Sequence, residues 1–155
     1  MPSYSDIYCK FGETSEAAQL LEIELGTFLL VEKCTQEDLL GKDGTRASEI
    51  MEKINRQTLG SLIKSANNLK ISEVEIIADQ LEAALEKRNV LAHSFYRLHN
   101  MRIHSDEGRL VMMSDLNNIH KIIFDAYKQL MLLRGIDLDL LSQQKIDFPT
   151  KHLPI

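Results

Sequence analysis

Two residues with complementary chemistry stand five positions apart in the segment Leu85–Arg97. Arg88 carries a planar guanidinium that is always charged, and His93 carries an imidazole that can give or take a proton near neutral pH. Asn89 follows the arginine and supplies an amide that can hold a geometry. Arg88 therefore favours an anionic partner or ligand, and His93 favours general acid or base chemistry.

The position of Arg88 on its helix is unusual, because it falls on the apolar face. Its neighbours along that face recur at helical spacing: Ile77, Leu81, Leu85, Ala92 and Phe95. An unpaired buried charge costs several kcal/mol, so Arg88 should have a partner, a water-lined cleft or an anionic ligand. The structural alternative is a carboxylate partner such as Glu22 or Glu24, with the stem of Arg88 covering apolar surface.

A row of polar residues lies on a second face of the same helix. Asn89 precedes His93 by four residues, and Tyr96 and Arg97 follow it by three and four. We interpret Asn89, Tyr96 and Arg97 as binding residues, the last two at the rim of the site. Arg88 and His93 lie about 140° apart around the helix axis, so two copies of the helix across a two-fold axis would combine them better than one. A structural His at a helix interface is the alternative for His93.

The run Arg88-Asn89-Val90-Leu91-Ala92-His93 resembles the Arg-x4-6-His motif of the HEPN superfamily, in which a polar residue usually follows the arginine. The segments 58–63 and 108–112 are similar to uncharacterised bacterial chains that carry such a motif. This resemblance implies an all-helical domain that forms a homodimer through the motif helices. It also implies a metal-independent endoribonuclease, often a toxin or defence component, with an antitoxin or another protein as a possible partner.

By the same resemblance, Arg88 would bind and neutralise the scissile phosphate, and His93 would handle protons while a 2′-hydroxyl attacks it. Asn89 would orient one of the two. One subgroup of the family carries a tyrosine two residues after the histidine, where this chain has Phe95, so regulation through modification of Tyr96 is not expected. The alternative function is a noncatalytic helical dimer that binds a nucleotide or a partner protein with the polar row.

Composition limits the other possibilities. The chain has 155 residues, enough for one domain, and a formal net charge of −5, which argues against a general nucleic-acid coat. Cys9 and Cys34 form no C-x-x-C pair, and the spacing of the histidines places no two of them on one helical face, so we expect neither a metal nor a cofactor. The first residues lack a signal-peptide pattern and no run of 18 apolar residues occurs, so a cytoplasmic protein without a membrane span is expected.

The pattern predicts an all-α, HEPN-like bundle with two long antiparallel helices and two or three shorter ones. We expect an extended N-terminal lead-in over residues 1–13, a single domain over 14–146 and a C-terminal tail over 147–155. The long motif helix should begin with a capping box formed by Ser72 and Glu75. The expected helices cover residues 14–34, 48–55, 59–67, 72 to about 98 or 100, 110–134 and part of 136–145.

Overall fold

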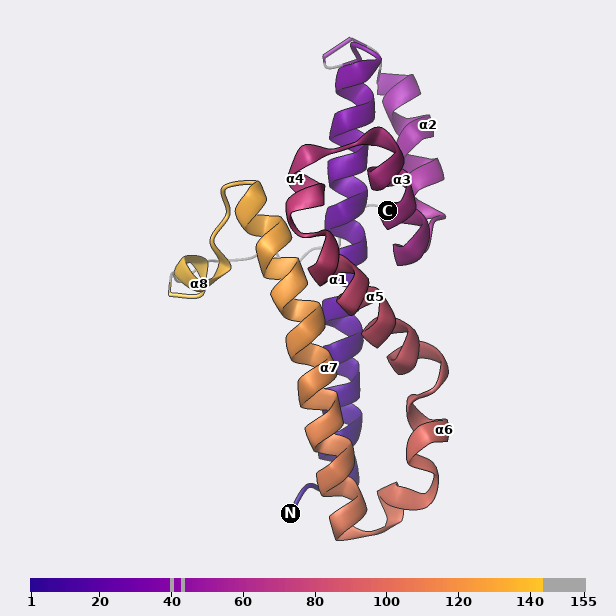
Figure 1. Ribbon diagram of the computed structural model, residues 1–155, viewed down its shortest axis with the longest axis vertical. Helices are drawn as coiled ribbons and strands as arrows, with labels where there is room; N and C mark the ends of the chain where they lie inside the picture. The colour runs from indigo at the N-terminus through magenta and orange to yellow at the C-terminus, as the bar shows by residue number, and fades with distance from the viewer. Residues whose placement is uncertain (40, 43, 144–155) are drawn as a thin grey trace.

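The computed structural model describes residues 1–39, 41–42 and 44–143, and this part of the chain is helical without a strand (Figure 1). The prediction of an all-α protein is therefore confirmed, while the expected tail over 147–155 lies outside the described residues. None of the helices in these ranges is long and apolar enough to cross a membrane. The elements follow in the order α1 (Tyr4–Gln36), α2 (Gly44–Asn55), α3 (Leu59–Leu69), α4 (Ser72–Ile76), α5 (Ala78–His93), α6 (Phe95–His99), the 3₁₀ helix η1 (Asn100–His104), α7 (Asp106–Leu133) and α8 (Leu138–Leu141).

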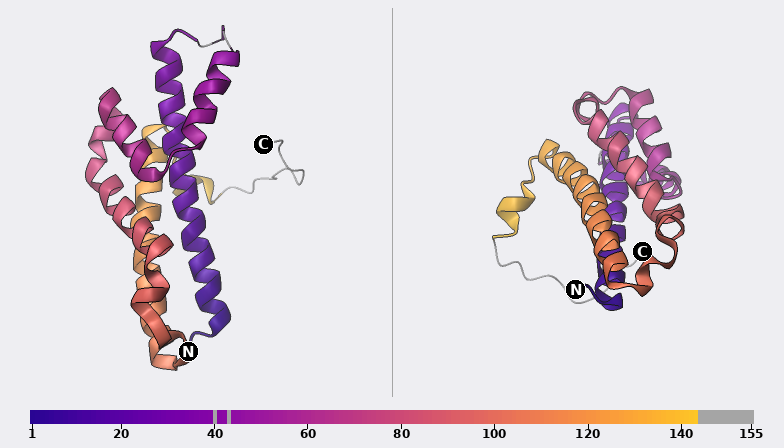
Figure 2. Two further views of the ribbon diagram at one scale, coloured as in Figure 1. Left: turned by 90° about the vertical axis from the view of Figure 1, so that its right-hand side faces the viewer. Right: turned by 60° about the horizontal axis from the view of Figure 1, so that its bottom comes forward.

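Helices α1 and α7 form the central pair of the fold, with α2 and α3 covering the upper part of α1 and α5 lying against α7 (Figures 1 and 2). Arg109, near the start of α7, donates to the Pro2 carbonyl oxygen at 2.7 Å, whereas Arg134, just past the end of α7, pairs with Glu24. Residue numbers thus increase together along the two helices, which run parallel. The predicted antiparallel pair is the motif helix and the last long helix. The motif segment does run antiparallel to α7, whereas the two longest helices of the fold, α1 and α7, are parallel.

The predicted extended lead-in over residues 1–13 is wrong, because α1 begins at Tyr4. Ser3 caps the helix: its hydroxyl accepts from the Asp6 backbone N–H, and the Asp6 carboxylate accepts from the Ser3 backbone N–H at 2.7 Å. This reciprocal pair satisfies two backbone donors at a helix start. The early start places Phe11 on α1, where its ring packs 5.7 Å from that of Phe95.

The buried stripes of the long helices agree with the sequence pattern. Ala18, Leu21 and Leu25 of α1 are buried, and so are the six α7 residues Met112, Leu116, Ile119, Ile123, Ala126 and Leu130. The inward residues of α3 are also buried as expected: Leu59, Leu62, Ile63 and Ala66. Burial of apolar surface is the dominant favourable contribution to such a fold, so α1 and α7 fix the frame that holds the motif helix.

The predicted single motif helix is broken twice, at Ile77 and at Ser94, which separate α4, α5 and α6. Ile77 and Phe95, at or beside the breaks, are both buried, so the chain leaves regular helix where packing on the core requires it. The predicted capping box is absent: Ser72 is the first residue of α4, and its hydroxyl bonds to Glu73. Arg88 and His93 still share one helix, α5.

Candidate functional site

Arg88 projects from α5 toward α1 and is mostly buried, with a side chain 22% exposed. Its Nε and Nη2 atoms both lie 3.0 Å from Oε1 of Glu22, whose side chain is 23% exposed. Its Nη1 donates to the Asn89 side-chain oxygen at 3.3 Å. Arg88 thus has a partner, as predicted, and this partner is one of the two carboxylates named by the structural alternative.

The residues that form the buried face of α5 differ slightly from the expected ones. Leu81, Ala84, Leu91 and Phe95 are buried, whereas Ala92 is exposed. Arg88 thus follows Ala84 and precedes Leu91 on the buried face, at the edge facing α1 rather than at its centre. This position lets the aliphatic stem cover apolar surface while the guanidinium reaches a carboxylate on the neighbouring helix.

A groove of about 290 Å³ lies beside Arg88, between α1 and α5. Its lining combines Arg88 and Glu22 with small and apolar side chains: Phe11, Ser15, Ala18, Gln19, Leu91 and Ala92. A guanidinium has five N–H donors, and three of those of Arg88 are engaged by Glu22 and Asn89. Two donors remain for an anionic group that enters the groove.

His93 is the last residue of α5 and is exposed. Within the described part of the chain, no hydrogen bond, ion pair or ring contact involves its imidazole. Within one copy of the chain, His93 is therefore not a satisfied His at a helix interface, and such an interface between two copies stays the structural alternative. Arg88 points at α1 while His93 faces solvent, so one copy does not bring the two side chains onto a single ligand.

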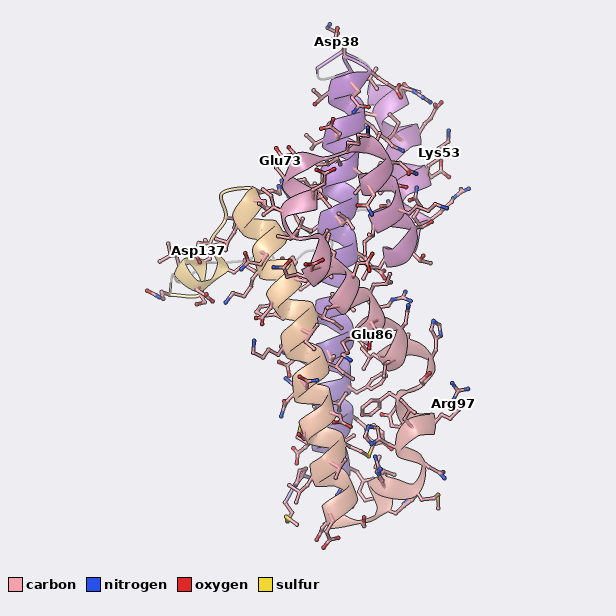
Figure 3. All side chains as sticks on the ribbon, in the orientation of Figure 1. Asp38, Lys53, Glu73, Glu86, Arg97 and Asp137 are labelled. Atoms are coloured by element: carbon pink, nitrogen blue, oxygen red, sulfur yellow. The ribbon has the colours of Figure 1, made fainter. Side chains whose placement is uncertain are left out.

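The remaining predicted binding residues lie on both sides of the break at Ser94. Asn89 is exposed on α5 and accepts from Arg88, whereas Arg97 of α6 donates to the Ser94 hydroxyl at 3.1 Å and extends away from the bundle (Figure 3). The rings of Tyr96 and Phe11 lie 5.2 Å apart. Partial burial raises the pKa of the Tyr96 phenol, and the nearby Tyr8 raises it further. The break thus places Tyr96 at the end of the groove instead of in one continuous row.

An exposed apolar strip accompanies the groove. Tyr8 is 57% exposed, Tyr96 is 42% exposed, and Ile23 of α1 is 63% exposed. Tyr8 and Ile23 lie fifteen positions apart on α1, close to four helical turns, so they share one side of the helix. Arg88 and Glu22 lie near the Ile23 end of this strip, which is otherwise suited to contact with another apolar surface.

Sequence reasoning missed a second polar cluster, on the other side of α5. His99 is only 4% exposed; its Nε2 lies 3.3 Å from Oδ2 of Asp115 on α7, and its Nδ1 lies 3.2 Å from Nη1 of Arg102. Burial lowers the pKa of His99. The nearby Asp115 raises this pKa, and Arg102 lowers it further. The three-residue spacing from His99 to Arg102 was visible in the sequence, but the pairing with α7 was not.

Among the residues that the structure describes, no group of three or more His, Cys, Asp or Glu side chains is placed to hold a metal ion. Cys9 is exposed and Cys34 is buried, and both are free thiols.

Comparison with known proteins provides no relative: no protein-family model, curated protein or solved structure matches the chain. The resemblance of the segment 88–93 to the HEPN motif therefore stays a prediction, and so do the activity and the partners that it implies.

Proposed function

We propose that the chain is a homodimeric, HEPN-like endoribonuclease that works without a metal ion, plausible as a toxin or defence component. The observation that carries this proposal is the placement of Arg88. It is a guanidinium held by Glu22 and Asn89 at the edge of an open groove, with two donors unused. Five residues later on the same helix stands an imidazole without a partner among the described residues.

The proposed reaction needs two functions that these residues supply. Arg88 binds a phosphate oxygen and stabilises the charge that spreads over it in the transition state, while His93 transfers a proton to or from the reacting oxygens. Asn89 and Glu22 orient the guanidinium. Because Arg88 and His93 point in different directions within one copy, the proposed cleft combines Arg88 of one subunit with His93 of its partner.

The surface around the groove supports both the dimer and the RNA substrate. The exposed strip of Tyr8, Ile23 and Tyr96 offers apolar area to a second copy. The parts of Tyr8 and Tyr96 that stay accessible offer faces on which bases of single-stranded or structured RNA stack, and Arg97 offers a cation for the backbone. The acidic net charge limits this binding to a local site.

A second function is favoured by one specific observation, the Arg88–Glu22 ion pair. A guanidinium already neutralised by a carboxylate is the arrangement expected of a noncatalytic dimeric module that binds a nucleotide or a partner protein. In that case Arg88 fixes α5 on α1, and His93 and Arg97 serve as contact residues only.

RNA cleavage in excess EDTA distinguishes the two functions. The ribonuclease proposal expects the wild-type protein to cut RNA, and expects Arg88→Ala and His93→Ala each to abolish cleavage while keeping the fold and the oligomeric state. Arg56→Ala and His104→Ala serve as matched controls: Arg56 pairs with Glu52 on α2, and His104 bonds to Tyr4 below the groove. Absence of cleavage by micromolar wild-type protein on mixed cellular RNA would support the binding module instead.

A further inference from the structure

A second groove lies on the side of α5 opposite Arg88, between α5, α6 and η1 on one wall and α7 on the other. Its volume is about 310 Å³, at the lower end of the range of roughly 300–1,000 Å³ for small-molecule sites. The polar residues that line it are Lys87, His99, Arg102, Asp115 and Asn118. Val90, Phe95, Leu98 and Ile119 supply an apolar wall.

One hydrogen bond of His99 indicates its protonation. A guanidinium only donates, so Nδ1 of His99 accepts from Arg102, and the proton of the neutral ring is on Nε2. Nε2 lies 3.3 Å from Oδ2 of Asp115. The Asp115 carboxylate, whose side chain is 55% exposed, lies beside the His99 ring and forms no ion pair with Lys87 or Arg102 in the described part of the chain.

Two cationic side chains, Arg102 and Lys87, line this groove, and neither forms an ion pair with a carboxylate on the opposite wall among the described residues. In the described part of the chain, no carboxylate forms an ion pair with Arg102, and its one side-chain hydrogen bond goes to the neutral His99. Lys87 is mostly buried, and its partner is the adjacent and mostly exposed Glu86, at 3.0 Å. Four N–H donors of Arg102 are thus available at an apolar wall, and the Lys87 ammonium keeps the N–H donors that Glu86 does not engage.

The backbone that carries Arg102 is held rigidly. The first turn of α7 approaches so closely that a Cβ at Gly108 would overlap the Arg102 carbonyl group. Asn100, two residues before Arg102, has φ of 40° and ψ of −126°, a strained conformation for a non-glycine residue. A strained backbone persists where its surroundings over-determine it, so the backbone of Arg102 is held against the first turn of α7.

We propose that this groove binds a small organic anion, with its phosphate or carboxylate group on Arg102 and Lys87 and its apolar body against Val90, Phe95 and Ile119. Asn118 adds an amide that can donate to the same anionic group. The proposal does not depend on the ribonuclease function, because α5 separates this groove from Arg88. It would stand if the chain cut no RNA, and it could fail while cleavage is confirmed.

Titration calorimetry and the ¹⁵N signals of the His99 ring test the proposal with three probes: phenyl phosphate, benzoate and inorganic phosphate. We expect at least one organic anion to bind and to shift the His99 signals, more tightly than inorganic phosphate because the apolar wall contributes. Tighter binding of phenyl phosphate assigns the site to phosphate monoesters, and tighter binding of benzoate assigns it to carboxylates.

Arg102→Gln keeps a donor for His99 but removes the charge, and should weaken binding by about ten- to a hundredfold. Lys87→Gln should weaken binding as well; it makes no contact with His99, so it decides the test if Arg102→Gln is unfolded. Arg56→Gln, just past the end of α2, is the matched control and should leave affinity unchanged. The proposal is overturned if millimolar amounts of all three probes leave the His99 signals in place, or if Arg56→Gln weakens binding as much as Arg102→Gln.

Discussion

Replacing Glu22 by leucine removes the counter-charge of Arg88 and puts an apolar side chain of similar size at the edge of the groove. In the structure, two guanidinium nitrogens share one Glu22 oxygen at 3.0 Å, and both side chains are more than three quarters buried. Exposed ion pairs contribute about 0.2–1 kcal/mol, whereas breaking a fully buried pair costs about 3–5 kcal/mol. We therefore expect Glu22→Leu to lower the free energy of unfolding by about 1–3 kcal/mol.

A double-mutant cycle separates the ion pair from the other effects of each substitution. Glu22→Leu, Arg88→Met and the double variant are unfolded with urea, at two protein concentrations because a dimer makes stability concentration-dependent. We expect the double variant to lose less than the sum of the single variants, with a coupling of about 1 kcal/mol, since it leaves no unpaired charge. Additive losses, within about 0.3 kcal/mol, would refute the claim that Glu22 holds Arg88.

Three further predictions concern the rest of the fold. Burial lowers the pKa of His99 and of His120, so near these pKa values the folded state binds fewer protons than the unfolded state. The free energy of unfolding that these two histidines contribute should be fully present above about pH 6.5. It should fall as the pH drops toward their lowered pKa values. Urea unfolding across this pH range checks the prediction, and His99→Gln should flatten the slope. Gly108→Ala should destabilise the fold by about 2 kcal/mol or more, because the new Cβ would overlap the Arg102 carbonyl. Gly12→Ala, in open space within α1, should stabilise the fold by about 0.5–1 kcal/mol. Thermal unfolding of both variants tests this pair. Leu116→Ala, at a fully buried position of α7, should cost about 2–5 kcal/mol in the same assay, and a loss below 1 kcal/mol would contradict its place in the core.

The parts of the fold that the sequence predicts well are those governed by a local pattern. The apolar repeat of α7 identifies six buried residues, from Met112 to Leu130, while its last member, Leu133, is partly buried. A long helix packed on one side repeats the same contact every three or four residues. The start of α1 was also visible, in the capping pair of Ser3 and Asp6. It was missed because the segment before Thr14 shows no clear apolar period.

The features that the sequence does not predict arise from contacts between distant segments. No glycine or proline marks the breaks at Ile77 and Ser94, so a continuous helix was the reasonable expectation. The parallel direction of α1 and α7 follows from the three-dimensional path of the chain between them. The cluster of His99 with Asp115 depends on that same path, because its members come from α6 and α7.

The candidate site was predictable in part. A charged residue on an apolar face requires a partner, and this argument led to Arg88 and to Glu22 as one of two carboxylates before any geometry was known. The direction of His93 was not predictable, since it depends on where α5 ends. A helix that continued through Ser94 would have placed Tyr96 and Arg97 in one row with His93, whereas the break turns them toward separate surroundings.

The central claim is that Arg88 of one subunit and His93 of its partner form one site, and subunit mixing tests it most directly. Arg88→Ala and His93→Ala proteins, each inactive alone, are mixed, allowed to exchange subunits and assayed for RNA cleavage in excess EDTA. About half of the dimers are mixed, and each mixed dimer has one intact site of two, with both side chains. We therefore predict recovery of roughly one quarter of the wild-type activity. No recovery in a mixture shown to contain mixed dimers would contradict a site shared between subunits.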